Sequence, residues 1–265
     1  MIRASAPREE IREEVAEAAN VLSRLGLVTA FGHVSARVPA SVPGPGSAPA
    51  GDSMLITPAA DLAGVTAADV LEVPLRAPGP LPAGVPAEAW VHLALYQARP
   101  DAAAIARAQP LSAYAAAATA TSLVPLYGQA AWLGESVPVH DGAALLRSPG
   151  LAERAARSLP SGEALLLRGN GAVTLGATAG LAVARMWLLA AACEVYLSAR
   201  QAAVTPLSAE EIASWRGVGH ELLPRMWEHL RRRPGTPAGS RGLRAEFKEP
   251  GPGWRGHDDG STPLL

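Results

Sequence analysis

The chain has 265 residues, of which 49% are hydrophobic, and its formal net charge at pH 7 is −1. A chain of this length can bury the core of a full domain, and a charge so close to zero gives no general attraction to nucleic acid or to an anionic membrane. The single cysteine, Cys193, excludes a disulfide within the chain. The only lysine, Lys248, lies in a Pro/Gly-rich tail, which argues against a Schiff-base enzyme. No secretory signal pattern opens the sequence, so we expect a cytoplasmic protein.

The first half of the chain predicts helices that alternate with short strands. Residues 8–25 place apolar side chains at helical spacing, and Gly26 is a natural end for that helix. Residues 31–38 alternate between apolar and polar side chains, which is typical of a strand, and residues 40–52 form a Pro/Gly/Ser-rich loop. Further on we expect a hairpin partner strand at 54–57, a short helix at 67–71, a helix at 87–98, a strand at 103–107 and a helix from 110 to about 119.

The second half begins with short strands and ends with long helices. We expect strands at 123–127 and 137–140, a helix at 151–158, a hairpin of 164–168 with 172–175, and helices near 179–202 and 208–233. Gly169-Asn170-Gly171 is a strong turn signal because Asn and Gly tolerate positive φ. The run 179–202 is apolar enough to suggest a membrane span, but Arg185 and Glu194 interrupt it, which favours a buried core helix.

These elements predict an α/β/α three-layer sandwich, because helices flank short and mostly antiparallel strands on both sides. Residues 1–235 would form this domain. Residues 236–265 are rich in Pro and Gly with scattered charge, and we expect them to be a flexible C-terminal tail.

Several motifs, in order along the chain, resemble the class II aldolase/adducin family over roughly residues 8–205. They are Pro86-Ala87-Glu88-Ala89-Trp90-Val91-His92, Arg99-Pro100-Asp101-Ala102, Ile105-Ala106-Arg107-Ala108-Gln109-Pro110 and Leu165-Leu166-Leu167-Arg168-Gly169-Asn170-Gly171-Ala172-Val173. The resemblance implies the same sandwich around a mixed, mainly antiparallel sheet. It also implies a cyclic homotetramer with active sites between neighbouring subunits.

The family's metal ligands are replaced in this chain. The metal enzymes of the family read His-x-His after the Pro-Asp and His-Gly at the later turn, whereas this chain has Arg107, Gln109 and Asn170 at those positions. An arginine does not bind a cation, and neutral amides are poor zinc ligands. We therefore expect no metal ligands and no cofactor.

Glu88 is the candidate catalytic base. In the family its position carries the carboxylate that takes a proton from the carbon beside a carbonyl, a task that suits a buried carboxylate. Read without the family, Glu88 is a solvated residue in the first turn of a helix, where the dipole favours it. His92 lies four residues later on the same helix face and would support Glu88 or pack in the core rather than bind a metal.

Arg107 has two interpretations. Its guanidinium, placed where a metal would lie, could hold a carboxylate or enolate as a fork, with Gln109 and Asn170 as neutral donors. Alternatively, Arg107 fills a decayed site in which it forms a salt bridge with Glu88.

The phosphate-binding segments of the family also differ here. The corresponding segments are Gly32-His33-Val34-Ser35, Thr57-Pro58-Ala59-Ala60 and Pro86-Ala87, in which methyl groups and a proline replace hydroxyls and a glycine. We therefore expect a substrate without phosphate, and His33 could contact its carboxylate or phenol, although a strand histidine is equally ordinary. The catalytic candidate Tyr127 and the substrate-binding candidate Gln129 lie where family members line the cavity. His140, a further substrate-binding candidate, follows the strand predicted at 137–140.

Two classes of function follow. The first is a carbon–carbon lyase, either an aldolase or a decarboxylase, acting through an enolate-like intermediate on a small carboxylated aromatic or hydroxy acid. Glu88, Arg107 and Tyr127 would be catalytic, while His33, Gln109, Gln129, His140 and Asn170 would bind the substrate. The second is a catalytically inactive adducin-like scaffold or ligand-binding protein. In both cases we expect a homotetramer with neither nucleic-acid nor membrane partners.

Overall fold

The computed structural model describes residues 8–28, 30–38, 52–76 and 79–234. The loop predicted at 40–51 and the tail predicted at 236–265 lie outside these residues, so both remain predictions. The described helices are α1 Arg8–Arg24, α2 Ala89–Ala98, α3 Leu111–Thr119, α4 Pro149–Arg157, α5 Ala179–Ala199, α6 Ala209–Gly217 and α7 Gly219–Arg232, with 3-10 helices at η1 Ala67–Asp69 and η2 Gly128–Leu133. The strands are β1 His33–Val38, β2 Ser53–Ile56, β3 Leu71–Pro74, β4 Ala104–Ala108, β5 Ser122–Leu123, β6 Val137–His140, β7 Ala164–Leu167 and β8 Gly171–Gly176.

The strands form one eight-stranded sheet in the order β3-β2-β1-β4-β8-β7-β6-β5. Every pair is antiparallel except β6 with β7, which is parallel and is joined by the crossover that contains α4. This confirms the mixed, mainly antiparallel sheet. In the centre of the sheet, Arg107 on β4 lies between His33 on β1 and Val173 on β8, which places the ends of these strands side by side.

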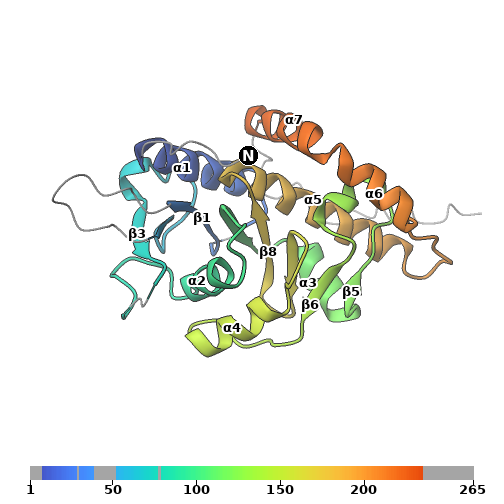
Figure 1. The fold of residues 1–265 in the computed structure, drawn as a ribbon, viewed down its shortest axis with the longest axis horizontal. Helices are drawn as coiled ribbons and strands as arrows, with labels where there is room; N and C mark the ends of the chain where they lie inside the picture. The colour runs from blue at the N-terminus through green and yellow to red at the C-terminus, as the bar shows by residue number, and fades with distance from the viewer. Residues whose placement is uncertain (1–7, 29, 39–51, 77–78, 235–265) are drawn as a thin grey trace, which may run out of the picture. The chain divides into compact units, whose positions relative to one another are not determined.

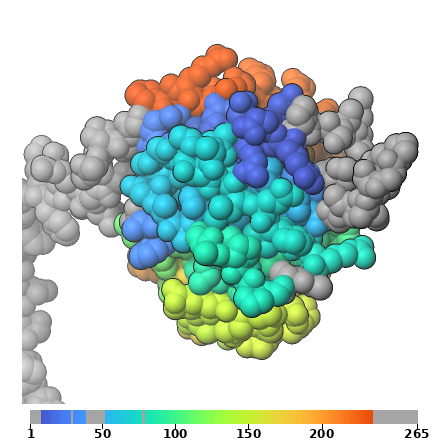
Figure 2. All heavy atoms as spheres, turned by 90° about the vertical axis from the view of Figure 1, so that its left-hand side faces the viewer, coloured from blue at the N-terminus to red at the C-terminus, as the bar shows by residue number. Residues whose placement is uncertain are grey.

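Helices cover both faces of the sheet, which confirms the three-layer sandwich. Helices α1, α3 and α5 pack on one face, and α2 and α4 pack against each other and against the other face (Figure 1). Seen from the β3 edge, α7 and α4 lie on opposite sides of this edge (Figure 2). Each face has its own apolar core, so the sheet is buried on both sides.

Strand β1 is buried on both of its faces. Val34, Ala36 and Val38 face the core beneath α1 and α5, as their alternation predicts. The sequence alone suggested a polar opposite face, but α2 covers it, and His33 and Ser35 are 4% and 0% exposed. Because buried polar groups need hydrogen-bond partners, these two side chains must find them inside the protein.

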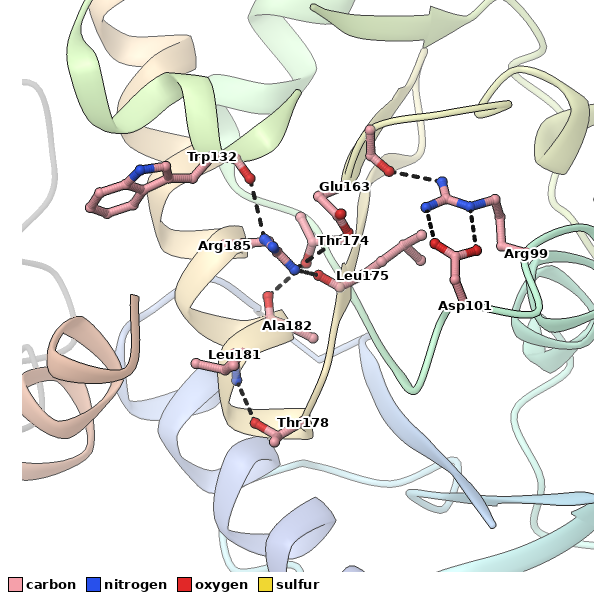
Figure 3. A network of polar contacts seen from close by, with 11 residues as sticks. Arg99, Asp101, Trp132, Glu163, Thr174, Leu175, Thr178, Leu181, Ala182 and Arg185 are labelled. Atoms are coloured by element: carbon pink, nitrogen blue, oxygen red, sulfur yellow. Dashed lines mark hydrogen bonds and ion pairs between the residues drawn. The ribbon is translucent and has the colours of Figure 1, made fainter. Parts of the chain in front are cut away.

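Helix α5 passes through the core. It is the one described helix long and apolar enough to cross a membrane, a weak signal because half of it is buried against the rest of the domain. Its Arg185 points toward the end of the sheet, where it donates to the carbonyls of Leu175 and Trp132 and pairs with Glu163 at 3.3 Å (Figure 3). The Thr178 hydroxyl accepts from the Leu181 amide and caps the helix.

The structure corrects three boundaries. Strand β3 was not predicted, because its burial alternates over only four residues at the sheet edge. The helix predicted at 208–233 is two helices, which meet at Val218 between Gly217 and Gly219. The 164–175 hairpin turns through a three-residue loop, since Leu167 pairs with Gly171 and the positive φ values fall on Gly169 and Gly171.

The junction of β8 and α5 gives a test of the packing. A Cβ added at Gly176 would lie 2.4 Å from the Ala182 nitrogen and 2.7 Å from the Thr178 oxygen, both backbone atoms. We expect Gly176→Ala to lower the free energy of unfolding by about 1–3 kcal/mol, the usual cost of overpacking. Urea unfolding measures it. The control is Gly217→Ala, which meets nothing within 4 Å and should change stability by less than about 0.5 kcal/mol. Equal effects of the two changes would contradict the close contact.

Candidate functional site

Four side chains from separate segments meet at the end of β4. Arg107 is on β4, Gln109 follows that strand directly, Asn170 lies in the β7–β8 loop, and Glu88 stands immediately before α2. Glu88 was predicted inside the helix, but the helix begins at Ala89. Its carboxylate therefore leaves the helix end and reaches the sheet.

Arg107 is the centre of this cluster. The residue is 1% exposed, and its guanidinium lies 2.9 Å from the Glu88 carboxylate. One terminal nitrogen also donates to the side-chain oxygen and to the carbonyl of Asn170. With its amide oxygen toward Arg107, Gln109 accepts from the same guanidinium and donates to the carbonyl of Phe31. Three partners thus surround one buried cation.

Glu88 is held as firmly as Arg107. Its Oε1 accepts from the side-chain amide of Asn170 at 2.8 Å and from the backbone amide of Leu146 at 2.9 Å, while Oε2 pairs with Arg107. Asn170 bridges the pair because its oxygen faces the cation and its nitrogen faces the carboxylate. The salt bridge between Arg107 and Glu88, which the sequence left as one of two alternatives, is present in the free protein.

The electrostatics of the cluster follow from burial. Burial lowers the pKa of Arg107, and the charge of Glu88 opposes that shift. Burial also lowers the pKa of His92 to about 3, with a further contribution from the Arg107 charge. Burial likewise lowers the pKa of His33 well below its usual value, and the neighbouring His92 and Arg107 lower it further. Both imidazoles are therefore neutral at physiological pH.

The two histidines contact each other and do not contact Glu88. His33 Nδ1 lies 2.8 Å from His92 Nε2, and His92 Nδ1 lies 2.7 Å from the Ser35 hydroxyl, which is 2.8 Å from the phenol of Tyr96. His92 thus packs in the core, which was one of its two expected roles. Sequence reasoning missed Ser35 and Tyr96, although Ser35 shares the strand face of His33 and Tyr96 lies one helical turn after His92.

The other candidates lie elsewhere in the chain. Tyr127 donates to the carbonyl of Leu188 on α5, and burial raises its pKa to about 12. Gln129 is in η2, and His140 at the end of β6 contacts the hydroxyl of Ser158 at 3.0 Å. Within the described residues, no hydrogen bond or ion pair joins these three to Glu88 or Arg107, so their roles remain predictions.

The comparisons with known proteins agree with this fold. The family model described as Class II Aldolase and Adducin N-terminal domain matches residues 13–197, and the chain belongs to this family. Among solved structures, the L-fuculose-1-phosphate aldolase from Thermus thermophilus is 28% identical with a TM-score of 0.60, covering 73% of this chain and 95% of its own. No curated protein has a sequence that matches significantly.

Two more distant structures support the fold alone. A putative aldolase/epimerase/decarboxylase, YgbL from Escherichia coli, is 21% identical with a TM-score of 0.64 and covers 79% of this chain and 99% of its own. An aldolase II superfamily protein from Pseudomonas syringae is 23% identical with a TM-score of 0.67, covering 87% of this chain and 94% of its own.

The residues present do not fit the divalent metal of the family. Oε2 of Glu88 and the side-chain oxygen of Asn170 point at the Arg107 guanidinium, which itself brings a positive charge to the position. Among the described residues, no group of three or more His, Cys, Asp or Glu side chains is arranged to hold a metal ion. A cation placed here would meet a fixed positive charge and too few suitable ligands.

Metal content tests this conclusion. We expect purified, undialysed protein to carry less than about one tenth of an equivalent of zinc, iron or manganese, given the ligand preferences of these ions. The combined change Arg107→His, Gln109→His and Asn170→His should bind zinc, whereas Arg107→Ala alone should not. Elemental analysis of the three proteins measures this. Stoichiometric metal in the wild type would show that the ligands come from elsewhere.

Stability tests the buried pair. Arg107→Ala leaves Glu88 buried without its counter-charge, and we expect a loss of about 3–5 kcal/mol in the free energy of unfolding. Adding Glu88→Gln should restore much of that loss, because the stranded charge is removed. The control is Arg232→Ala, which breaks an exposed pair with Glu228 and should cost less than about 1 kcal/mol. Urea unfolding measures all four proteins; a double variant no more stable than Arg107→Ala would refute the pairing.

Proposed function

We propose that this protein is a carbon–carbon lyase, an aldolase or decarboxylase that acts without a metal on a small carboxylated, non-phosphorylated acid. One observation carries the proposal: a buried guanidinium, held by a carboxylate and two amides, stands at the metal position of an aldolase scaffold. A fixed positive charge in a dry site stabilises a developing enolate, the role that a divalent ion has in the metal enzymes.

The contacts suggest how the pair would open. A substrate carboxylate can replace Glu88 on Arg107, because both present the same two-oxygen edge to the planar fork. Released Glu88 would still be held through Oε1 by Leu146 and Asn170. Its freed Oε2 would then exchange a proton with the carbon beside the substrate carbonyl. The electron pair left on that carbon passes to the carbonyl oxygen, and the Arg107 charge stabilises the enolate. Gln109 and Asn170 orient Arg107 rather than act as the neutral donors expected from the sequence, because their amide oxygens face the guanidinium and their nitrogens donate to Phe31 and Glu88.

The region that binds phosphate in family aldolases supports a substrate without phosphate. The hydroxyl of Thr57 accepts from the Val34 amide, and the amide of Ala59 donates to the carbonyl of Gly84. These donors and acceptors are used within the fold, so few remain for phosphate oxygens.

A non-catalytic scaffold is the competing function, and the closed salt bridge favours it. A carboxylate with both oxygens engaged is a weak base until a ligand opens the pair. The two functions differ in one measurable respect, because only the enzyme needs the pair to exchange with an acid.

Proton exchange on pyruvate, a small acid with a carbonyl and no phosphate, tests the enzyme. In heavy water the wild type should replace the methyl protons of pyruvate with deuterium, as followed by NMR. Glu88→Gln should slow the exchange by about 10²–10⁴-fold, the usual contribution of a general base. The matched control is Glu228→Gln, which removes an exposed carboxylate on α7 and should leave the rate unchanged.

Binding gives an independent measure. Glycerate and hydroxybenzoate should raise the melting temperature, whereas glycerol phosphate should not. Arg107→Lys should weaken acid binding by roughly 2–4 kcal/mol, because a point charge does not reproduce the fork. If no acid shifts the wild-type melt and pyruvate does not exchange, the scaffold is the correct function.

A further inference from the structure

Four buried polar side chains form a continuous chain next to Arg107. In order, they are Tyr96 on α2, Ser35 on β1, His92 on α2 and His33 on β1, joined by contacts of 2.8, 2.7 and 2.8 Å. All four residues are at most 4% exposed. His33 is the last member and lies directly across from Arg107 in the sheet.

The number of hydrogens in this chain is fixed. Both imidazoles are neutral, because burial and the Arg107 charge lower the pKa of each. Each neutral imidazole and each hydroxyl then contributes one polar hydrogen, which makes one hydrogen more than the three contacts require. The extra hydrogen must point out of the chain, at the Tyr96 end, at the Ser35 hydroxyl or at the His33 end. At Ser35 it would be a buried donor without a partner, because the residue is 0% exposed and, within the described residues, its hydroxyl contacts only Tyr96 and His92.

The Tyr96 end offers no place for it. Tyr96 is 2% exposed, and within the described residues its phenol has no hydrogen-bond partner other than Ser35. The guanidinium of Arg37 lies over the ring at 5.0 Å, and arginine has no acceptor to offer. A phenol hydrogen pointing away from Ser35 would be a buried donor without a partner, which is costly.

The His33 end is open. Its Nε2 has no hydrogen-bond partner in the described part of the chain and is not fully enclosed by the protein, so a hydrogen there can reach solvent or a ligand. The Arg107 cation would favour a lone pair there, but the hydrogen bonds of Arg107 go to Gln109 and Asn170, and its charge is paired with Glu88. Tyr96 therefore donates to Ser35, Ser35 donates to His92 Nδ1, and His92 Nε2 donates to His33 Nδ1.

We infer that this chain of hydrogen bonds fixes His33 in the tautomer with hydrogen on Nε2, so that His33 is a neutral donor to an oxygen of the bound acid. Ser35 and His92 are positioning residues that act through His33. The ligand chemistry follows, because a neutral N–H donor beside a guanidinium suits a carboxylate or enolate oxygen and does not remove a proton. The donor role rests on the proposed function, whereas the tautomer does not.

Nitrogen NMR of uniformly labelled protein tests the tautomer without any substrate. Between pH 6 and 8, His33 and His92 should both carry hydrogen on Nε2 and neither should titrate. The six histidines of the chain are assigned by single substitutions. A His33 with hydrogen on Nδ1, or a protonated imidazole at either position, overturns the inference.

Two variants separate positioning from simple packing. Ser35→Ala removes the only hydroxyl next to His92, so His92 and His33 should change to a mixture of tautomers. Tyr96→Phe should keep the wild-type tautomers, because the Ser35 hydroxyl still donates to His92 Nδ1. Identical tautomers in wild type and Ser35→Ala would show that the chain does not set them. If either variant does not fold, the wild-type spectrum still decides.

A titration tests the donor role. Pyruvate or glycolate should shift the Nε2 and attached proton resonances of His33 and leave those of His220, a control histidine on α7, unchanged. If neither acid moves His33, the donor role is wrong. Melting temperatures measured with the same acids then show whether the proposed function fails with it: acids that raise the melting temperature without moving His33 overturn the donor role alone.

Discussion

The positive charge of Arg107, buried at the end of β4, is the constraint on which the site depends. A guanidinium that is 1% exposed has lost its water and must be neutralised and hydrogen-bonded within the protein. The carboxylate comes from the start of α2, one amide from the β7–β8 loop and the other from the segment directly after β4. One charge therefore fixes the relative positions of three segments that are distant in the sequence.

The same requirement explains how an aldolase scaffold can hold an arginine where relatives place a metal. A divalent ion and a guanidinium both bring positive charge into a dry pocket, and both need neighbouring groups to neutralise and bind that charge. They differ in geometry, because the guanidinium is attached to a strand and directs its hydrogens in one plane. In this structure the flat anion that faces the guanidinium is the Glu88 carboxylate.

Much of the fold and of the candidate site could be predicted from the sequence, and the features that could not be predicted have identifiable physical reasons. The alternation in β1, the glycine after α1 and the cap before α6 are local signals, and each gave its element. The family motifs brought Glu88, Arg107, Gln109 and Asn170 together correctly. The burial of His33 depends on which helix covers the second face of β1, and no local pattern contains that information. Likewise, the break at Val218 and the exit of Glu88 from α2 depend on one or two residues, below what periodicity resolves.

The crossover between the parallel strands β6 and β7 carries a further consequence. The backbone amide of Leu146 lies in this connection and donates to the same carboxylate that neutralises Arg107. Exchange of an amide hydrogen with solvent requires its hydrogen bond to open, so the exchange rate at Leu146 reports how often the connection and the carboxylate separate. A single backbone amide thus records how often the site opens, in a protein with or without a ligand.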